Sequence, residues 1–306
     1  MRHETISPPR ACPLCGAGPD MAEPFLSDTR DEERLSGFSF ASRKTPEYMS
    51  HAMVRCRSCD LAYVDRPPSA SSLAESYHAA DYDSAREAED AADAYARAIA
   101  PALGQLRRRA RALEIGTGTA AFLERLERAG FSELVGVEPS TAAIAAAPDH
   151  RRGWIREGIF VEGDYAPESF DLICCFMTLE HVPDPGALVR SAHRLLRPGG
   201  VFVGVTHDRR AWLNRLLGRR SPIVDIEHMQ LFSAESAKGL LSRHGYVDVG
   251  GTSFRNAYSP SYWLRLVPMP DGAKQGLTGL VRKSGLDGLR LPVNVGNFMS
   301  WGFKAG

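Results

Sequence analysis

The chain has 306 residues, of which 43% are hydrophobic, and its 37 Lys and Arg residues balance 37 Asp and Glu residues. This length allows one or two domains with a full core, and a net charge of zero gives no overall attraction to nucleic acid or to an anionic membrane. The sequence has neither an N-terminal signal peptide nor a long uninterrupted apolar span. Six cysteines, four of them in two CxxC pairs, favour metal binding in a reducing cytoplasm over disulfides. We therefore expect a cytoplasmic protein without membrane insertion.

Residues 1–66 contain both CxxC pairs and are rich in turn-forming residues. Each pair can present two thiolates from one tight turn, and two such turns complete a tetrahedral zinc site. Bound zinc would stabilise a segment that has few apolar residues of its own. The alternative is a set of reduced thiols without a metal. We predict a zinc-binding module in which Cys12, Cys15, Cys56 and Cys59 hold a structural zinc ion, with no ligand position left open for catalysis.

The next segment, residues 67–109, starts with two prolines that mark a linker. It continues as an Ala-rich stretch with interspersed Glu and Arg, a composition that favours helix. We therefore predict a helical linker or lid between the N-terminal module and the remainder of the chain.

From residue 110 to residue 306, short apolar stretches alternate with amphipathic stretches. This alternation predicts the α/β class, with a parallel sheet and helices on both of its faces. Strands are predicted near residues 111–115, 133–138, 154–160, 170–176, 200–206, 246–254 and 296–304, and helices near 119–130, 140–147, 185–196 and 233–244. An insertion at about 256–295 separates the last two strands, and it either covers the mouth of a substrate site or pairs subunits.

The most informative segment is LEIGTGTAA, residues 113–121, at the first predicted strand-to-helix turn. Gly116 and Gly118 would let the backbone lie against a ligand where any Cβ would collide. The segment also satisfies the loose dinucleotide fingerprint, so alone it does not distinguish between adenosine cofactors. Glu138, in the GVEPS segment, has the spacing at which an acidic side chain meets ribose hydroxyls, and this fits either cofactor.

The segment 169–205 is more specific than the glycine loop. It contains an apolar strand, a loop reading EHVPDP, an amphipathic helix, an LRPGG turn and another apolar strand. With these motifs the chain resembles the class I S-adenosylmethionine-dependent methyltransferases, particularly the ubiquinone-biosynthesis O-methyltransferases. The resemblance implies a Rossmann-like seven-stranded sheet whose last strand is antiparallel, with S-adenosylmethionine as the cofactor. A nicotinamide enzyme would have no particular use for the EHVPDP and LRPGG pair.

The resemblance also implies which residues hold the cofactor. Glu114 would support its amino-acid end, and Glu138 would bind both ribose hydroxyls. Apolar packing against the adenine is expected from Ile159 or Phe160, with Asp164 as a weaker polar candidate. The complete predicted set is Glu114, Gly116, Thr117, Gly118, Glu138, Pro139, Ile159, Phe160 and Phe176.

Methyl transfer is an in-line displacement, so the enzyme has to align a nucleophile and remove its proton. Histidine is the natural base near neutral pH, and His181 lies just past the fourth strand, at the sheet edge where α/β proteins bind ligands. Ubiquinone-type enzymes have a Glu-x-x-Glu-His run here that is associated with a divalent cation. Met177 replaces the first Glu, which argues against metal-assisted catalysis. The alternative role of His181 is to buttress the cofactor pocket.

A second catalytic candidate is the EH-x-x-x-FS run at residues 227–233. It resembles the deoxysugar C-methyltransferases, which also carry a paired-CxxC zinc module. By that resemblance His228 abstracts a proton, Glu227 orients or assists it, and Tyr77 or Tyr82 helps to hold the substrate. Neighbouring residues in an extended stretch point in opposite directions, so the alternatives are a supporting role for Glu227 and a helix-entry contact for His228. Which of the two histidines is the base stays open.

Three classes of function follow from these features. The leading hypothesis is methyl transfer to carbon or oxygen of a small polar metabolite, such as a sugar or a natural-product intermediate. An RNA base methyltransferase would need a basic face, which the balanced charge disfavours, so no nucleic-acid partner is expected. A non-catalytic scaffold would keep the fold without the chemistry, and the intact glycine loop with Glu114 and Glu138 argues against it. The sequence does not distinguish a monomer from a homodimer.

Overall fold

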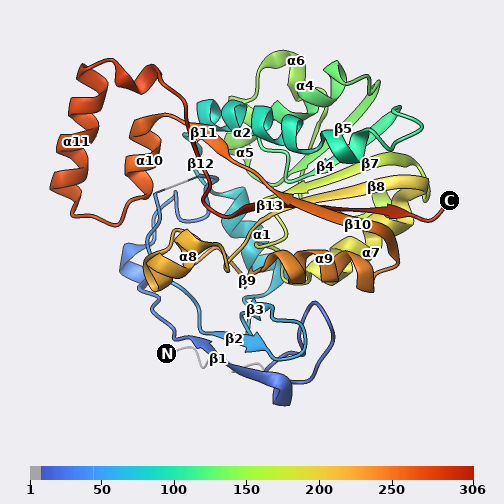
Figure 1. Ribbon diagram of the computed structural model, residues 1–306, viewed down its shortest axis with the longest axis horizontal. Coiled ribbons are helices and arrows are strands. Elements are labelled where there is room, and N and C mark those ends of the chain that lie inside the picture. The colour runs from blue at the N-terminus through green and yellow to red at the C-terminus, as the bar shows by residue number, and fades with distance from the viewer. Residues whose placement is uncertain (1–7, 44) are drawn as a thin grey trace.

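The computed structural model describes residues 8–43 and 45–306, and its largest element is a seven-stranded sheet (Figure 1). The strands follow the order β10-β13-β8-β7-β4-β5-β6. Strand β13 is antiparallel to both of its neighbours, whereas the other neighbouring strands are parallel. The bounds are β4 (Arg111–Ile115), β5 (Glu133–Glu138), β6 (Ile155–Glu157), β7 (Phe170–Phe176), β8 (Leu196–His207), β10 (Tyr246–Ser253) and β13 (Asn297–Lys304). This topology confirms the predicted α/β, Rossmann-like class.

Helices cover both faces of this sheet, as Figure 1 shows for α2 and α4 on one face and for α7 and α9 on the other. The central strand β7 reads FDLICCF and is buried along its whole length, which is why it needs cover on both sides. The helices are α1 (Ala70–His78), α2 (Ala85–Ala98), α3 (Ala100–Leu103), α4 (Ala121–Arg128), α5 (Thr141–Ala146), α6 (Asp149–Arg152), α7 (Pro185–Leu195), α8 (Trp212–Leu217), α9 (Ala234–Arg243), α10 (Pro260–Leu266) and α11 (Asp271–Lys283). Short 3-10 helices are η1 (Pro19–Met21), η2 (Glu32–Arg34), η3 (Glu162–Asp164), η4 (Gly218–Arg220) and η5 (Leu286–Gly288).

Several motif residues begin helices and so have a structural reason to occur where they do. The Asp184 side chain accepts a hydrogen bond from the Ala187 amide at 2.8 Å and caps α7, with Pro185 at the first helical position. Ser140 caps α5, and Ser233 forms a capping box at the start of α9. The EHVPDP, GVEPS and FS segments therefore each contain a helix start.

Three predicted elements differ from the structure. The strand predicted near 200–206 begins already at Leu196, so the LRPGG run predicted as a turn belongs to β8. The strand predicted at 154–160 ends at Glu157, because Gly158 has a φ of 126° and turns the chain out of the sheet. The helical segment predicted over 67–109 is divided into α1, α2 and α3, with an irregular stretch between α1 and α2. This division lets the chain turn above the sheet edge.

The N-terminal region forms a second sheet with the order β1-β2-β3-β9. Its strands are β1 (Ala22–Leu26), β2 (Met53–Cys56), β3 (Ala62–Tyr63) and β9 (Gln230–Leu231). Strand β9 belongs to the same segment as Glu227 and His228, and the Val64 amide donates to the Met229 carbonyl at 2.9 Å. The cysteine-containing region is thus hydrogen-bonded directly to the EH segment.

The insertion at 256–295 folds as α10, α11 and the two-stranded sheet of β11 (Asn256–Tyr258) and β12 (Leu291–Val293). Figure 1 shows α10 and α11 projecting beside the large sheet. Tyr258 and Tyr262 are buried in one hydrophobic cluster with Tyr95 of α2, so the insertion packs on the lid helix. Within the described residues, no helix has the length and hydropathy that crossing a bilayer requires.

A charged network fixes the helix α2 to α4 and α6. The guanidinium of Arg151 in α6 is buried and pairs with Glu89 of α2 and Glu124 of α4. Arg125 lies 2.6 Å from Glu89 and 2.9 Å from Asp93. Because Arg151 bridges carboxylates of two helices, it holds α2 in place above the turn between β4 and α4.

Replacing Arg151 tests this bridge. We expect Arg151→Met to lower the free energy of unfolding by about 2–4 kcal/mol, because Glu89 and Glu124 would lose the buried cation between them. The neighbouring Arg152 pairs with Asp149 at an exposed site, so Arg152→Met should change stability by less than about 0.5 kcal/mol. Urea denaturation followed by circular dichroism measures both, and equal effects of the two variants would contradict the bridge.

Candidate active site

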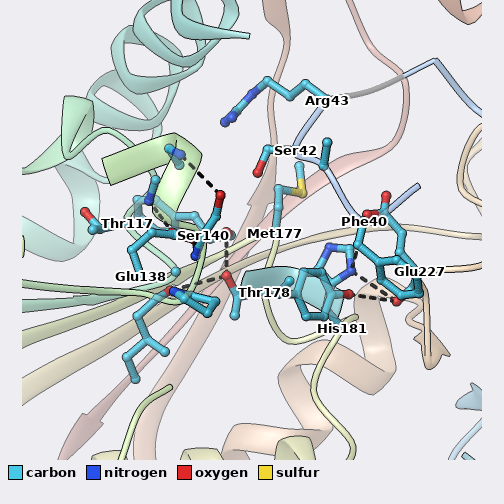
Figure 2. Close-up of a pocket in the computed structure, with 18 of the residues that line it drawn as sticks. Phe40, Ser42, Arg43, Thr117, Glu138, Ser140, Met177, Thr178, His181 and Glu227 are labelled. Atoms are coloured by element: carbon cyan, nitrogen blue, oxygen red, sulfur yellow. Dashed lines mark hydrogen bonds and ion pairs between the residues drawn. The ribbon is translucent and has the colours of Figure 1, made fainter. Parts of the chain in front are cut away.

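A cavity of about 600 Å³ lies at the carboxyl ends of the parallel strands, the edge at which α/β sheets bind ligands. Its wall contains all of the predicted cofactor residues, together with Tyr77, Tyr82, His181, Glu227 and His228. The structure therefore brings residues from β4, β5, β7, the lid helices and the EH segment to one cavity, part of which is drawn in Figure 2. Their individual roles stay predictions.

The glycine loop is shaped by close contacts. Gly116 has a φ of 77°, and a Cβ on it would lie 2.2 Å from the Thr178 hydroxyl oxygen, so no side chain fits there. Gly118 also has a positive φ, of 55°, and its amide donates to the Glu138 carboxylate at 2.6 Å. The loop thus presents bare backbone to the cavity while its amide is held by the end of β5.

Glu114 lies beneath this loop and is 4% exposed. Burial raises the pKa of Glu114 to about 8, although the Thr117 hydroxyl, which donates to the carboxylate at 2.5 Å, lowers it. The side chain is therefore mostly neutral near pH 7. A ligand ammonium group would favour its ionised form, so Glu114 suits the amino end of the expected cofactor.

Glu138 ends β5 with both carboxylate oxygens held by backbone amides. One oxygen accepts from Ser140 at 2.9 Å and the other from Gly118 at 2.6 Å, and Figure 2 shows Glu138 beside Thr117 and Ser140. Burial raises the pKa of Glu138, and the two amides oppose that shift. Each oxygen keeps a further lone pair, so the carboxylate can accept two hydroxyl groups of one ribose.

The expected adenine end of the cavity is apolar. Ile159 is 55% exposed there, and Phe160 stacks on Tyr165 with a ring separation of 6.3 Å. Asp164, the weaker polar candidate, is exposed outside the cavity lining. Phe176 lines the cavity at the end of β7, between aromatic rings of α2 and α4 at 4.8 Å and 4.7 Å.

At the other end of the cavity lies the candidate catalytic pair. His181 Nδ1 is 4.0 Å from a Glu227 carboxylate oxygen and 3.2 Å from the Glu227 carbonyl oxygen. The Tyr77 hydroxyl donates to the same carbonyl at 3.2 Å, and its ring meets the His181 ring edge to face. Figure 2 shows His181 and Glu227 side by side. The Glu227 carbonyl thus orients the imidazole of His181, and the Glu227 carboxylate lies beside the same ring nitrogen.

His228 lies behind this pair and is only 4% exposed. Its Nδ1 is 2.8 Å from the Ile223 carbonyl oxygen, and its ring centre is 4.8 Å from that of His181. Burial lowers the pKa of His228 to about 3, and the neighbouring charge of His181 acts in the same direction. The imidazole of His228 is therefore neutral near pH 7.

A third histidine, His207 at the end of β8, completes the cluster. Its amide donates to the buried Glu180 carboxylate at 2.9 Å, and its Nδ1 lies 3.2 Å from the same oxygen. Burial opposes charge on Glu180, but His207 outweighs it and holds the pKa of Glu180 at about 2. Burial likewise opposes charge on His207, and Glu180 raises the pKa of His207. The two side chains form an ion pair, with His207 in the cavity wall and Glu180 behind it.

The same cluster has donor atoms that can hold a metal ion. Two sets each place their nitrogen or oxygen ligand atoms within 4.8 Å of one another, and imidazole with carboxylate suits a divalent transition metal. The sets are Glu180, His207 and His228, and His181, Glu227 and His228.

The four cysteines of the N-terminal region converge on one point. All four sulfur atoms lie within 4.8 Å of one another, with 3.5 Å between Cys12 and Cys59 and 3.6 Å between Cys15 and Cys56. Zn–S bonds of about 2.3 Å in a tetrahedron place sulfurs about 3.8 Å apart. None of these cysteines forms a disulfide. The set therefore fits a structural zinc ion.

Several polar residues of the cavity wall were not predicted from the sequence, among them Arg43, His207, Asn256 and Asn297. His207 could have been found, because it ends β8 at the ligand-binding edge of the sheet, to which His181 was also assigned. The other three come from irregular loops or strand starts and have no motif around them.

Known methyltransferases are similar to this chain in sequence. A family profile described as a methyltransferase domain matches residues 85–249, more than half of the chain. The ubiquinone biosynthesis O-methyltransferase of Pseudomonas syringae pv. tomato is 30% identical over 117 residues, and that of Pseudomonas aeruginosa strain LESB58 is 32% identical over 117 residues. The match covers 35% of this chain and 49% of either relative, so the chain spans about half the length of the curated relatives it matches.

Solved methyltransferases are also similar in structure. A S-adenosylmethionine-dependent methyltransferase of Thermotoga maritima superposes with a TM-score of 0.48 at 20% identity, over 72% of this chain and 91% of that one. The phosphoethanolamine N-methyltransferase 2 of Haemonchus contortus in complex with S-adenosyl-L-methionine gives 0.45 at 17% identity, over 69% and 52%. On the profile match, the chain belongs to the methyltransferase domain family, as a class I S-adenosylmethionine-dependent member.

Proposed function

We propose that the protein transfers the methyl group of S-adenosylmethionine to an oxygen of a small hydroxylated metabolite. The observation that supports this most strongly is a single cavity with the Gly118–Glu138 contact at one end and the His181–Glu227 pair at the other. Oxygen is preferred to carbon because the curated relatives are O-methyltransferases. A sugar, a natural-product intermediate or a phenol related to ubiquinone precursors fits a cavity of about 600 Å³.

In this proposal His181 accepts the acceptor's proton. The support is that His181 is more exposed to the cavity than His228 and has the Glu227 carboxylate near its Nδ1. His228 has a pKa of about 3, far from the value that suits a base at neutral pH. We assign His228 the role of packing behind the ring of His181.

We also propose that the four cysteines bind one structural zinc ion, which steadies the turn that precedes β1 and the turn between β2 and β3. Strand β3 pairs with β9, and β9 follows directly after His228. Zinc would therefore support the position of the EH segment without taking part in the methyl transfer.

Binding of the cofactor should depend on pH. With a pKa of about 8, Glu114 is protonated below that pH in the free protein, and it has to lose its proton when the cofactor ammonium binds. Affinity for S-adenosylhomocysteine should therefore rise with pH from about pH 6 to pH 7.5, by up to about tenfold per pH unit. Isothermal titration calorimetry measures it, and Glu114→Gln should remove the dependence. A flat profile for the unmodified protein would contradict the role of Glu114.

Replacement of His181 and replacement of His228 should affect the rate of methyl transfer to different extents. His181→Gln should lower kcat for methyl transfer by about 10²–10³-fold, because the base is lost, while the affinity for S-adenosylhomocysteine changes less than about twofold. His228→Gln should lower kcat by less than about tenfold. Transfer of a labelled methyl group to a panel of catechols, hydroxylated sugars and keto sugars provides the assay. A larger loss in His228→Gln than in His181→Gln would reverse the assignment.

The purified protein should contain zinc bound by its four N-terminal cysteines. Freshly purified, reduced protein should contain one equivalent of zinc by mass spectrometry, because four sulfurs are already arranged around one point. Cys59→Ser should lose the metal and lower the Tm by several degrees, whereas the exposed neighbour Ser58→Ala should keep both unchanged. Retention of less than half an equivalent by the unmodified protein would count against the site.

A further inference from the structure

We propose that Arg43 makes the cavity selective for a methyl acceptor that carries an anionic group, either a carboxylate or a phosphate. This inference rests on the proposed methyl transfer and names its substrate class. The region concerned, called the Arg43 subsite below, consists of Arg43, Tyr95, Tyr258, Asn256 and Asn297, all of which line the cavity.

Arg43 is held in a backbone conformation that non-glycine residues seldom adopt. Its φ is 56°, and its side chain lines the cavity and is labelled in Figure 2 together with Ser42 and Met177. Unusual backbone conformations of this kind are strained and concentrate at ligand sites. Here the conformation turns a charged side chain from an N-terminal loop inward.

The surroundings of the guanidinium are aromatic rather than acidic. Burial lowers the pKa of Arg43, and the hydroxyls of Tyr258, Tyr95, Tyr82 and Tyr262 raise it. Among the described residues, no carboxylate forms an ion pair with Arg43; the carboxyl group on which its charge acts is the buried Glu114, whose pKa it lowers. Because Glu114 is mostly neutral near pH 7 in the free protein, an anionic ligand would supply the half-buried guanidinium with a counter-ion. Arginine also matches the two oxygens of a carboxylate or phosphate with parallel hydrogen bonds.

Unpartnered polar atoms lie in the same part of the cavity wall. Asn297 is 1% exposed, and neither its side-chain oxygen nor its nitrogen has a hydrogen-bond partner. Asn256 is 3% exposed; its nitrogen donates to the Tyr258 hydroxyl at 3.0 Å, but its oxygen has no partner. Buried polar atoms are normally hydrogen-bonded, so these atoms indicate where polar groups of a ligand would bind.

The position of the Arg43 subsite favours the acceptor over the cofactor. Tyr258 and Asn256 belong to β11 of the insertion, not to the glycine loop or the end of β5. Asn297 starts β13 directly opposite His207 of β8, so the subsite adjoins the histidine cluster. An acceptor bound with its anionic group on Arg43 would direct its reacting group toward His181.

The test compares matched anionic and neutral probes on the protein saturated with S-adenosylhomocysteine. The pairs are 4-hydroxybenzoate with its methyl ester, and phenyl phosphate with phenol, each measured by calorimetry. We expect at least one anionic probe to bind tenfold or more tightly than its neutral partner. The preference should disappear in Arg43→Met and be partly kept in Arg43→Lys. Arg265→Met is the control, because Arg265 contacts Tyr262 without lining the cavity, and it should keep the preference.

Three results would overturn the assignment. They are equal affinity for anionic and neutral probes in the unmodified protein, an unchanged preference in Arg43→Met, and a tenfold or greater loss of S-adenosylhomocysteine affinity in Arg43→Met, which would move Arg43 to the cofactor's own carboxylate. Failure of the proposed function looks different, because S-adenosylhomocysteine would then not bind the unmodified protein at all.

Discussion

The hydrogen bond from the Gly118 amide to the Glu138 carboxylate, at 2.6 Å, joins the ends of the first two strands of the parallel sheet. This hydrogen bond depends on the conformation of the glycine loop. Residue 116 of that loop has to be glycine, because a Cβ there would collide with Thr178. Because the same carboxylate also accepts from the Ser140 amide, the start of α5 is fixed to the same point. The glycine loop, Glu138 and the start of α5, which are proposed to hold the cofactor, are thus joined by hydrogen bonds at one point.

The rest of the site is assembled around this contact by elements from distant parts of the chain. The Arg151 bridge keeps α2 above the loop, and the insertion packs against the other side of α2 through Tyr258 and Tyr262. From below, pairing of β3 with β9 holds the segment that contains Glu227. The cavity is therefore closed by three regions that do not belong to the parallel strands, and these regions supply the groups that would distinguish one acceptor from another.

The sequence predicted the sheet well because its signals are local. Apolar runs, the glycine loop and helix caps such as Ser233 each act within a few residues, so β4, β5, β7 and α7 were located to within about two residues. The strand at 154–160 was predicted too long because Gly158 ends it, and a glycine in a strand pattern has more than one outcome. The depth of His228 and the inward turn of Arg43 depend on contacts between segments far apart in sequence. Such contacts leave no periodic pattern, and so they could not be predicted.

A crystal structure with bound S-adenosylhomocysteine tests the central claim most directly. We expect both ribose hydroxyls on the Glu138 carboxylate, the amino group near Glu114, and the sulfur directed toward the end of the cavity that contains His181. A cavity that stays empty at saturating ligand, or a ribose bound away from Glu138, would contradict the account of how this fold holds its cofactor.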